Sequence, residues 1–275
     1  MEQDEISRLK SISKKIAEDI LVMTTSANSG HPGGSLSIKD ILAVLLFKVM
    51  NYDFNNPEWP ERDRLVLSKG HGAPALYAAL IEAGVYDRSY LDRLRKVDSP
   101  LEGHPVKSKY IEASTGSLGN GFSFAVGMAL ASKIDRKGNM VYVVTGDGEL
   151  QEGIVWESAM VASHYHLDNL IAIVDRNGLQ IDGPTEQVMS LEPLKSKWEA
   201  FGWMVFEVDG HNIGMLLETL EKAKKSTGRP KVVIAHTTKG KGIPWEEWEV
   251  EFHGKPLSKE ELAKALAALE NGEQS

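Results

Sequence analysis

Hydrophobic positions recur along this 275-residue chain with two different periods, and each predicts a type of regular structure. Near the start, apolar residues from Ile6 to Ile20 fall three or four positions apart, which predicts an amphipathic helix over residues 5–28. Short apolar runs elsewhere have instead the length and residue content of strands. These predicted strands cover residues 64–68, 141–145, 170–174, 203–208 and 231–236.

Further helices are predicted between and after the strands. Ser37 and Asp40 have the spacing of a capping box at the start of an apolar helix that runs to Met50. Ser258 and Glu261 repeat this spacing before the last helix. The other predicted helices end near Leu80, Ile134, Tyr165 and Lys225.

Strands that alternate with helices predict an α/β fold of three layers, in which helices cover both faces of a mostly parallel sheet. We expect one domain over residues 1–257, followed by a C-terminal helix and polar tail over residues 258–275. Residues 29–34 (SGHPGG) are so rich in Gly and Pro that they are interpreted as a loop. Residues 236–253 are expected to form a long irregular segment.

Composition narrows the class of protein. The formal net charge of −8 argues against a surface for nucleic acid or anionic membrane. Cysteine is absent, which excludes a disulfide framework and a thiolate metal site. The longest wholly apolar run, residues 41–47, is too short to span a membrane, and no signal-peptide pattern precedes it. We therefore expect a cytoplasmic protein.

Residues 140–179 carry the first indication of chemistry. Gly146-Asp147-Gly148 ends one predicted strand, and Asn177-Gly178 follows the next strand along the chain. Because the carboxyl ends of neighbouring parallel strands meet at one edge of a sheet, Asp147 and Asn177 are expected to lie side by side. Carboxylate and amide oxygens suit a hard cation, and glycine lets an anion approach the backbone. Asp-Gly alone is a common turn, but its pairing with Asn-Gly favours a functional site.

The histidines are unevenly distributed. His164 and His166 lie at the end of a predicted helix and are interpreted as surface residues. For His211 and His236, which follow strand ends, a structural and a functional role are equally open. A single histidine in a loop is usually a solvated polar residue, but several in similar surroundings favour proton transfer at one site. Those that stand beside Gly or Pro in loops are His31, His71, His104 and His253.

Nine motifs occur in the order found in transketolases. They are SGHPGGSLS, RDRLVLSKGHG, EGHP, STGSLGNG, GDGELQEG, DRNGLQIDG, VDGHN, KGKG and HGKPL. Together they cover the chain from the first helix to about Leu257. They correspond only to the N-terminal, diphosphate-binding part of a full-length transketolase, which continues into two further domains. The chain therefore resembles the N-terminal subunit of a split, two-chain transketolase.

The resemblance implies a site for thiamine diphosphate and Mg²⁺, in which Ca²⁺ or Mn²⁺ can substitute. The implied metal ligands are the side chains of Asp147 and Asn177 and the backbone of Leu179. Glu152 matches a carboxylate that links paired active sites, and Gly34 stands where some members carry a serine that touches the cofactor. The implied catalytic residues are His31, His71, His104 and His253. The implied cofactor contacts are His71, Gly116, Ser117, Leu118, Gly148, Glu152, Asn177, Lys239 and His253.

The implied activity is the transfer of a two-carbon ketol unit from a ketose phosphate to an aldose phosphate, as in the pentose phosphate pathway. It would require a C-terminal transketolase subunit with the pyrimidine-binding domain, in an α2β2 assembly. Neither a nucleic acid nor a membrane is an expected partner. Apolar surface near Phe122, Val126 and Trp156 is expected to be uncovered in this chain alone and to mark the interface.

Alternative functions remain open at this point. The α subunit of a 2-oxo acid dehydrogenase also has a GDG…N pair, but it needs no set of four sugar-facing histidines. A ketol transferase for a modified sugar would carry the same motifs. A catalytically silent thiamine-binding chain is disfavoured, because Asp147, Asn177 and the histidines are all present.

Overall fold

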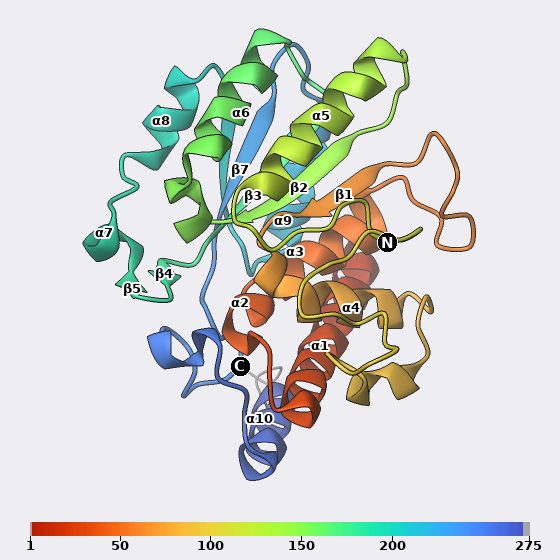
Figure 1. Cartoon of the computed structure of the whole chain (residues 1–275), viewed down its shortest axis with the longest axis vertical. Coiled ribbons are helices and arrows are strands. Elements are labelled where there is room, and N and C mark those ends of the chain that lie inside the picture. The colour runs from red at the N-terminus through yellow and green to blue at the C-terminus, as the bar shows by residue number, and fades with distance from the viewer. Residues whose placement is uncertain (1, 272–275) are drawn as a thin grey trace.

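Residues 2–271 form, in the computed structural model, an α/β fold around a five-stranded parallel sheet (Figure 1). The strand order is β1-β2-β3-β7-β6, and every neighbouring pair is parallel. A separate antiparallel pair is formed by β4 and β5. The strands are β1 Arg64–Leu67, β2 Val141–Gly146, β3 Leu170–Arg176, β4 Leu179–Gln180, β5 Gly183–Pro184, β6 Met204–Asp209 and β7 Lys231–His236.

The helices confirm most of the predicted ones and add short helices that the sequence pattern did not indicate. The additional elements are α2, α7 and α8, together with the β4-β5 pair. The helices are α1 Glu2–Ala27, α2 Pro32–Leu36, α3 Lys39–Val44, α4 Ala73–Glu82, α5 Asn120–Ile134, α6 Gly153–His164, α7 Thr185–Val188, α8 Leu194–Ala200, α9 Ile213–Lys225 and α10 Lys259–Asn271. None of the helices in residues 2–271 is long and apolar enough to cross a membrane.

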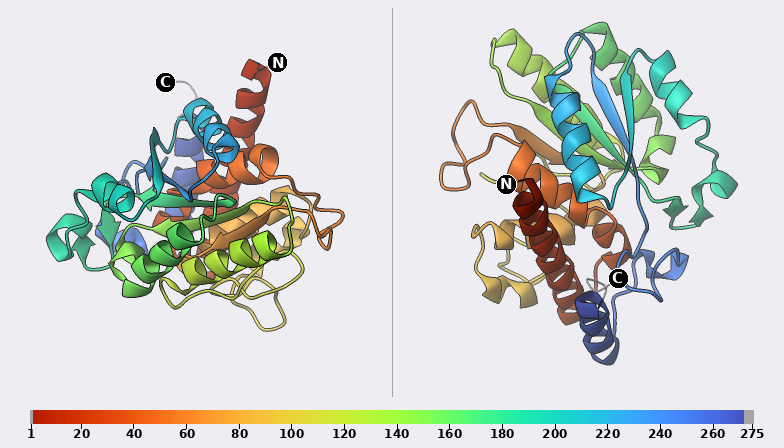
Figure 2. Two further views of the ribbon diagram at one scale, coloured as in Figure 1. Left: turned by 90° about the horizontal axis from the view of Figure 1, so that it is seen from above. Right: turned by 180° about the vertical axis from the view of Figure 1, so that it is seen from behind.

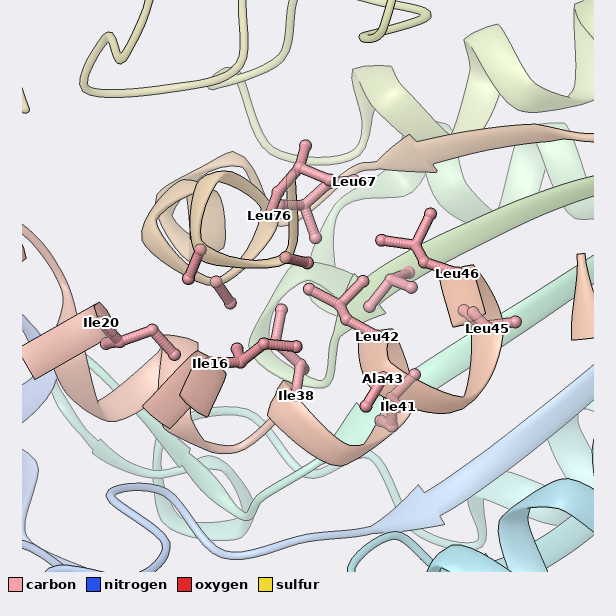
Figure 3. Packing of buried hydrophobic residues seen from close by; sticks show 14 of the residues in the cluster. Ile16, Ile20, Ile38, Ile41, Leu42, Ala43, Leu45, Leu46, Leu67 and Leu76 are labelled. Carbon is pink, nitrogen blue, oxygen red and sulfur yellow. The ribbon is translucent and has the colours of Figure 1, made fainter. Parts of the chain in front are cut away.

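Helices cover the sheet on both faces, as Figure 2 shows from above. One layer contains α5 and α6, and the other contains α1, α3, α4 and α9. Strand side chains alternate between the two hydrophobic cores: Val141 and Val143 of β2 belong to one, Tyr142 and Val144 to the other. Figure 3 shows part of the core on the α1 side. Burial on both faces explains why the central strands are apolar from Val141 to Val144 and from Leu170 to Val174.

The capping box predicted at Ser37 and Asp40 is wrong. α3 begins at Lys39 after Ile38, and no side chain caps its first turn. Both predicted capping residues are buried and bind distant partners instead. Ser37 Oγ donates to Asp175 (2.7 Å), and the Asp40 carboxylate accepts a hydrogen bond from Ser13 Oγ. The helix also ends in a π turn, Leu45–Val49.

The same motif at Ser258 and Glu261 is confirmed. The Glu261 amide donates to Ser258 Oγ (3.2 Å), and the Ser258 amide donates to the Glu261 carboxylate (2.8 Å). This helix, α10, packs against α1. The domain boundary at residue 257 stays a prediction, and residues 272–275 of the predicted tail lie outside the described residues.

The segment interpreted as a loop, residues 29–34, contains the start of a short helix. Pro32 occupies the first helical turn of α2, where its fixed φ is compatible with a helix. Gly33 allows close packing, because a Cβ there would lie 2.8 Å from the carbonyl oxygen of Phe252. The helix begins directly after His31 and therefore fixes the position of that side chain.

Candidate active site

A cavity of about 250 Å³ lies at the carboxyl ends of the parallel strands. Its lining includes residues one to three positions beyond the ends of four of them: Lys69 after β1, Asp147 after β2, Asn177 after β3 and Lys239 after β7. His31, at the start of α2, completes one wall. Ligands of open α/β sheets bind at this edge, so the cavity is the candidate site.

The structure brings the four predicted histidines together. The ring centroid of His31 lies 5.5 Å from that of His71, 5.6 Å from that of His253 and 6.4 Å from that of His104. His71 and His253 are stacked, with centroids 5.3 Å apart. His31, His71 and His253 line the cavity, and His104 stands beside His31. Segments far apart in the sequence therefore place four imidazoles in one cluster.

All four histidines are kept neutral by their surroundings. Burial, together with the nearby Arg95 guanidinium, lowers the pKa of His31 to about 4. Burial and the Lys239 ammonium lower the pKa of His253 to about 3. For the same kind of reason the pKa values of His71 and His104 lie below the usual 6.5. Neutral imidazole can accept a proton or donate a hydrogen bond, as acid–base chemistry requires.

The three candidate metal ligands form one continuous group. Asp147 and Asn177 are buried, and the Gly178 amide donates to Asp147 Oδ2 (2.6 Å). Asn177 Oδ1 accepts a hydrogen bond from the Leu179 amide (3.1 Å). The Lys239 ammonium donates a hydrogen bond to the Leu179 carbonyl (3.0 Å), so this carbonyl already lies beside a positive charge. Burial and the nearby Asp175 carboxylate raise the pKa of Asp147, and a bound cation would offset that penalty.

This donor set fits Mg²⁺ bound to a diphosphate. One carboxylate, one amide oxygen and one carbonyl oxygen are hard ligands of the type that Mg²⁺ prefers. Mg²⁺ is usually held by few protein ligands together with phosphate oxygens. Residues 2–271 contain no group of three or more His, Cys, Asp or Glu side chains that could hold a metal ion.

Glycine permits close approach to the cavity at two of the predicted cofactor contacts. A Cβ on Gly148 would lie 3.0 Å from the Cβ of Gln180, and one on Gly116 would lie 3.3 Å from the ring of His104. Gly116 also has a φ of +143°, which side chains rarely allow. A side chain at Gly34 would lie 3.3 Å from the His71 ring, so a serine there would require that ring to shift.

Two predicted cofactor contacts lie outside the cavity lining. Ser117 and Glu152 are exposed, whereas Gly116 and Leu118 line the cavity. The roles of Ser117 and Glu152 therefore rest on the family resemblance alone. The glutamate of the GDGELQEG motif that does reach the lining is Glu149.

Glu149 was not indicated by the sequence pattern, although it is a buried carboxylate beside Asp147. It connects the end of β2 to the start of α5 and to the end of β1. Its partners are Ser68 Oγ (2.5 Å), Thr145 Oγ1 (2.7 Å), the Gly119 amide (2.8 Å) and the Gly146 amide (3.0 Å). The only sequence signal was an acidic residue directly after a Gly-Asp-Gly turn.

A buried ion pair between Lys69 and Asp175 was also missed. Lys69 lines the cavity, and its ammonium donates to the Asp175 carboxylate and to the Gly34 carbonyl (2.8 Å). Burial alone would raise the pKa of Asp175, but Lys69 and the hydrogen bonds from Thr237 and Ser37 outweigh it and lower that pKa. The available signal in the sequence was the position of both residues near strand ends, within the motifs RDRLVLSKGHG and DRNGLQIDG.

The remaining histidines take no part in the cluster. His164 and His166 are exposed, as predicted. His211 accepts a hydrogen bond from the Thr238 amide (2.8 Å) and pairs with Asp40 (2.8 Å), so it connects α3 to the segment after β7. His236 is exposed and lies 3.2 Å from Glu207.

The predicted uncovered surface at Phe122, Val126 and Trp156 is wrong. Phe122 and Val126 are buried in the core beneath α5, because these positions of the helix face the sheet. The half-buried Trp156 packs on Trp198 and Phe201, at centroid distances of 5.0 and 5.1 Å. The exposed large apolar residues on or next to α5 and α6 include Leu118, Phe124, Met160 and Val161, and we call these four the outer apolar face.

Comparison with known proteins identifies the family of the chain. Residues 11–272 match the family described as transketolase, thiamine diphosphate binding domain. The chain is 49% identical over 243 residues to the 6-deoxy-6-sulfo-D-fructose transketolase subunit SqwG of Clostridium sp. (strain MSTE9), with 88% of each chain covered. It is 44% identical over 271 residues to an apulose-4-phosphate transketolase subunit of Actinobacillus succinogenes, covering 98% of this chain and 97% of that one.

Single-chain transketolases match over less than half of their length. Human transketolase is 43% identical over 260 residues, which are 94% of this chain and 41% of the human one. The solved transketolase from Leishmania mexicana superposes with a TM-score of 0.90 at 33% identity, covering 95% of this chain and 41% of that one.

Proposed function

The chain belongs to the transketolase family, through its thiamine-diphosphate-binding domain, and we propose that it is the N-terminal subunit of a two-chain transketolase. In this role it transfers a two-carbon ketol unit from a ketose phosphate to an aldose phosphate. Relatives that are named as subunits match almost from end to end, whereas single-chain transketolases are more than twice as long. The match to relatives named as subunits supports a separate C-terminal partner.

The observation that carries the proposal is the convergence of two sets of groups on one cavity. Buried Asp147, Asn177 and Leu179 carry the oxygen donors at the strand ends, which we call the deep end of the cavity, and three of the four clustered histidines line it. Thiamine diphosphate, when bound, supplies the carbanion chemistry that protein side chains lack. The oxygen donors would hold Mg²⁺, or Ca²⁺ or Mn²⁺ in its place, on the diphosphate, with the Gly148 amide nearby.

The histidines would handle protons and orient the sugar. His31 has a buried Nδ1 with no hydrogen-bond partner among the described residues, so a sugar hydroxyl or carbonyl can use it. His104 and His71 flank it on two sides and would bind the neighbouring hydroxyls. His253 Nδ1 lies 2.8 Å from the Lys239 ammonium, and burial lowers the pKa of Lys239 to about 8. These two residues would contact the diphosphate end.

The partner in this proposal is a C-terminal transketolase subunit with a pyrimidine-binding domain, joined in an α2β2 assembly in the cytoplasm. The exposed Glu152 would then lie where paired sites meet. The printed names of two relatives concern 6-deoxy-6-sulfo-D-fructose and apulose 4-phosphate. The sugars of this chain therefore include modified sugars as candidates beside the pentose phosphates.

A product assay tests the proposed function. The chain is mixed with the pyrimidine-binding subunit encoded nearest to it, thiamine diphosphate and Mg²⁺, and is offered xylulose 5-phosphate or a sulfo-sugar as donor with ribose 5-phosphate as acceptor. We expect a new ketose two carbons longer than the acceptor and no carbon dioxide from pyruvate. Release of carbon dioxide from pyruvate without ketol transfer would instead identify a 2-oxo acid dehydrogenase subunit.

A further inference from the structure

One buried carboxylate joins four segments that carry candidate site residues. Asp175 is fully buried near the end of β3, two positions before Asn177. Its Oδ2 accepts hydrogen bonds from Ser37 Oγ (2.7 Å), from Lys69 Nζ and from Asn177 Nδ2 (2.8 Å). Its Oδ1 accepts a hydrogen bond from Thr237 Oγ1. The carboxylate is therefore saturated by donors from the segments that follow α2, β1, β3 and β7.

The contact with Asn177 has a direction. An asparagine amide has a donor end, Nδ2, and an acceptor end, Oδ1. An ionised carboxylate only accepts hydrogen bonds, so Nδ2 must be the atom that faces Asp175. Oδ1 then points away from Asp175, where it accepts the hydrogen bond from the Leu179 amide (3.1 Å). The Leu179 amide, which needs an acceptor, favours the same orientation, and Asp175 is the charged one of these two partners.

We propose that Asp175 is a positioning residue that holds the Asn177 amide with its oxygen, and not its NH₂ group, toward the metal of the cofactor. This rests on the proposed function for the identity of the cation. A flipped amide would present a donor where a cation needs an acceptor, and the site would keep only one oxygen side chain, Asp147. Residues that orient metal ligands in this way typically change metal affinity by about 10- to 100-fold when they are replaced.

The test must separate amide orientation from the loss of a buried charge. Asp175→Asn removes the carboxylate that selects Nδ2, but it also leaves the buried Lys69 without its counter-ion. We therefore pair it with a swap, in which Asp175→Asn is combined with Asn177→Asp. The swap keeps the net charge, and a carboxylate at position 177 presents an oxygen in either orientation.

The readout is the affinity for Mg²⁺ in the presence of thiamine diphosphate, measured on the isolated chain by tryptophan fluorescence. Trp248 is a local reporter, because its ring packs so closely on Gly178 that a Cβ there would lie 2.9 Å away. We expect Asp175→Asn to weaken Mg²⁺ binding about 10- to 100-fold. We expect the swap to bind Mg²⁺ at least about tenfold more tightly than Asp175→Asn alone.

Thr237→Val is the matched control. It removes one hydrogen bond from the same carboxylate, but from Oδ1 and not from the oxygen that binds Asn177. Mg²⁺ affinity within about twofold of wild type is expected for this variant. A loss as large as that of Asp175→Asn would show that general support of the carboxylate matters, and would overturn the assignment. Wild-type affinity in Asp175→Asn, or a swap no better than Asp175→Asn, would overturn it as well.

Nuclear magnetic resonance keeps the inference testable if Asp175→Asn does not fold. In the wild-type chain, the side-chain NH₂ protons of Asn177 should exchange slowly with solvent, because they face a buried carboxylate. Fast exchange would place the NH₂ group in the cavity and contradict the assignment. If the wild-type chain binds no Mg²⁺ with thiamine diphosphate, the proposed function fails, whereas this exchange measurement still reports on the amide.

Discussion

The deep end of the cavity and the outer apolar face differ in how completely contacts within this chain satisfy their side chains. At the deep end, the buried carboxylates of Asp147, Glu149 and Asp175 each accept several hydrogen bonds from the same chain. On the outer apolar face, Phe124 is 46% and Met160 61% exposed, with no polar function of their own.

The difference indicates what each region still requires. A deep end with hydrogen-bonded carboxylates is organised before any ligand arrives, so we expect it to bind a diphosphate without help from another protein. Apolar side chains grouped on a surface usually mark a protein interface. We therefore propose that the chain carries one end of the cofactor site and that the outer apolar face binds the subunit that completes it.

Removal of the charged metal ligand should have the largest effect on the deep end. Asp147→Ala should abolish Mg²⁺-dependent binding of thiamine diphosphate, since no other candidate ligand carries a negative charge. The fold should persist, because Arg176 keeps ion pairs with Glu186 and Glu192. Asn177→Ala should weaken binding less. Fluorescence titration and circular dichroism check both variants, and wild-type affinity in Asp147→Ala would contradict the metal assignment.

The next largest effect should come from the histidine cluster. His104→Ala should lower kcat for ketol transfer in the assembled enzyme by about 100- to 10,000-fold, the usual contribution of acid–base catalysis. Cofactor affinity should stay almost unchanged, because His104 stands outside the cavity lining. His253→Ala should reduce both kcat for ketol transfer and the affinity for the cofactor. A loss of less than about tenfold for His104→Ala would assign this histidine to substrate positioning.

The lowered histidine pKa values predict a moderate loss of stability in acid. In the unfolded chain the pKa of histidine is about 6.5, whereas in the fold it is about 4 for His31 and about 3 for His253. Below pH 6.5 the unfolded state therefore binds more protons, so the free energy of unfolding should fall until about pH 3. Urea unfolding at several pH values measures this, and His31→Asn should flatten the curve. Stability that rises in acid would contradict neutral histidines.

Charged substitutions on the outer apolar face should have the smallest effect on the stability of the chain itself. Phe124→Asp with Met160→Asp should change the free energy of unfolding of the isolated chain by less than about 1 kcal/mol, since both side chains are largely exposed. Assembly with the partner subunit should weaken strongly, as size-exclusion chromatography can show. Val97→Asp, at an 86% exposed position away from this face, is the control. Unchanged assembly of the double variant would exclude this face from the interface.

The sequence predicted the fold well where the signal was local. Val141 to Thr145 and Leu170 to Val174 have few alternatives to buried parallel strands, and the comparison with solved transketolases confirms the fold class. The family was equally predictable, because nine motifs in one order leave little ambiguity. The site roles stay proposals, but the structure does gather the four histidines in one cluster, and three of them line the same cavity as the residues predicted as metal ligands.

The predictions from sequence were wrong or incomplete for residues whose structural role depends on partners distant in the sequence. Ser37-Asp40 and Ser258-Glu261 show the same local pattern, yet only the second caps a helix, because Ser37 is bound by Asp175 instead. No local pattern could reveal the pairing of Asp175 with Lys69, since 106 positions separate them. Phe122 and Phe124 are two positions apart on α5 and face opposite ways, which only the packing of the helix decides.

The most direct test of the central claim compares the chain alone with the chain plus its proposed partner. Ketol transfer is measured with saturating thiamine diphosphate and Mg²⁺, after fluorescence titration has verified cofactor binding by the isolated chain. We predict that the isolated chain binds cofactor but has essentially no turnover, and that activity appears when the pyrimidine-binding subunit is added. Turnover by the chain alone at a rate comparable to that of the mixture would contradict the two-chain assignment.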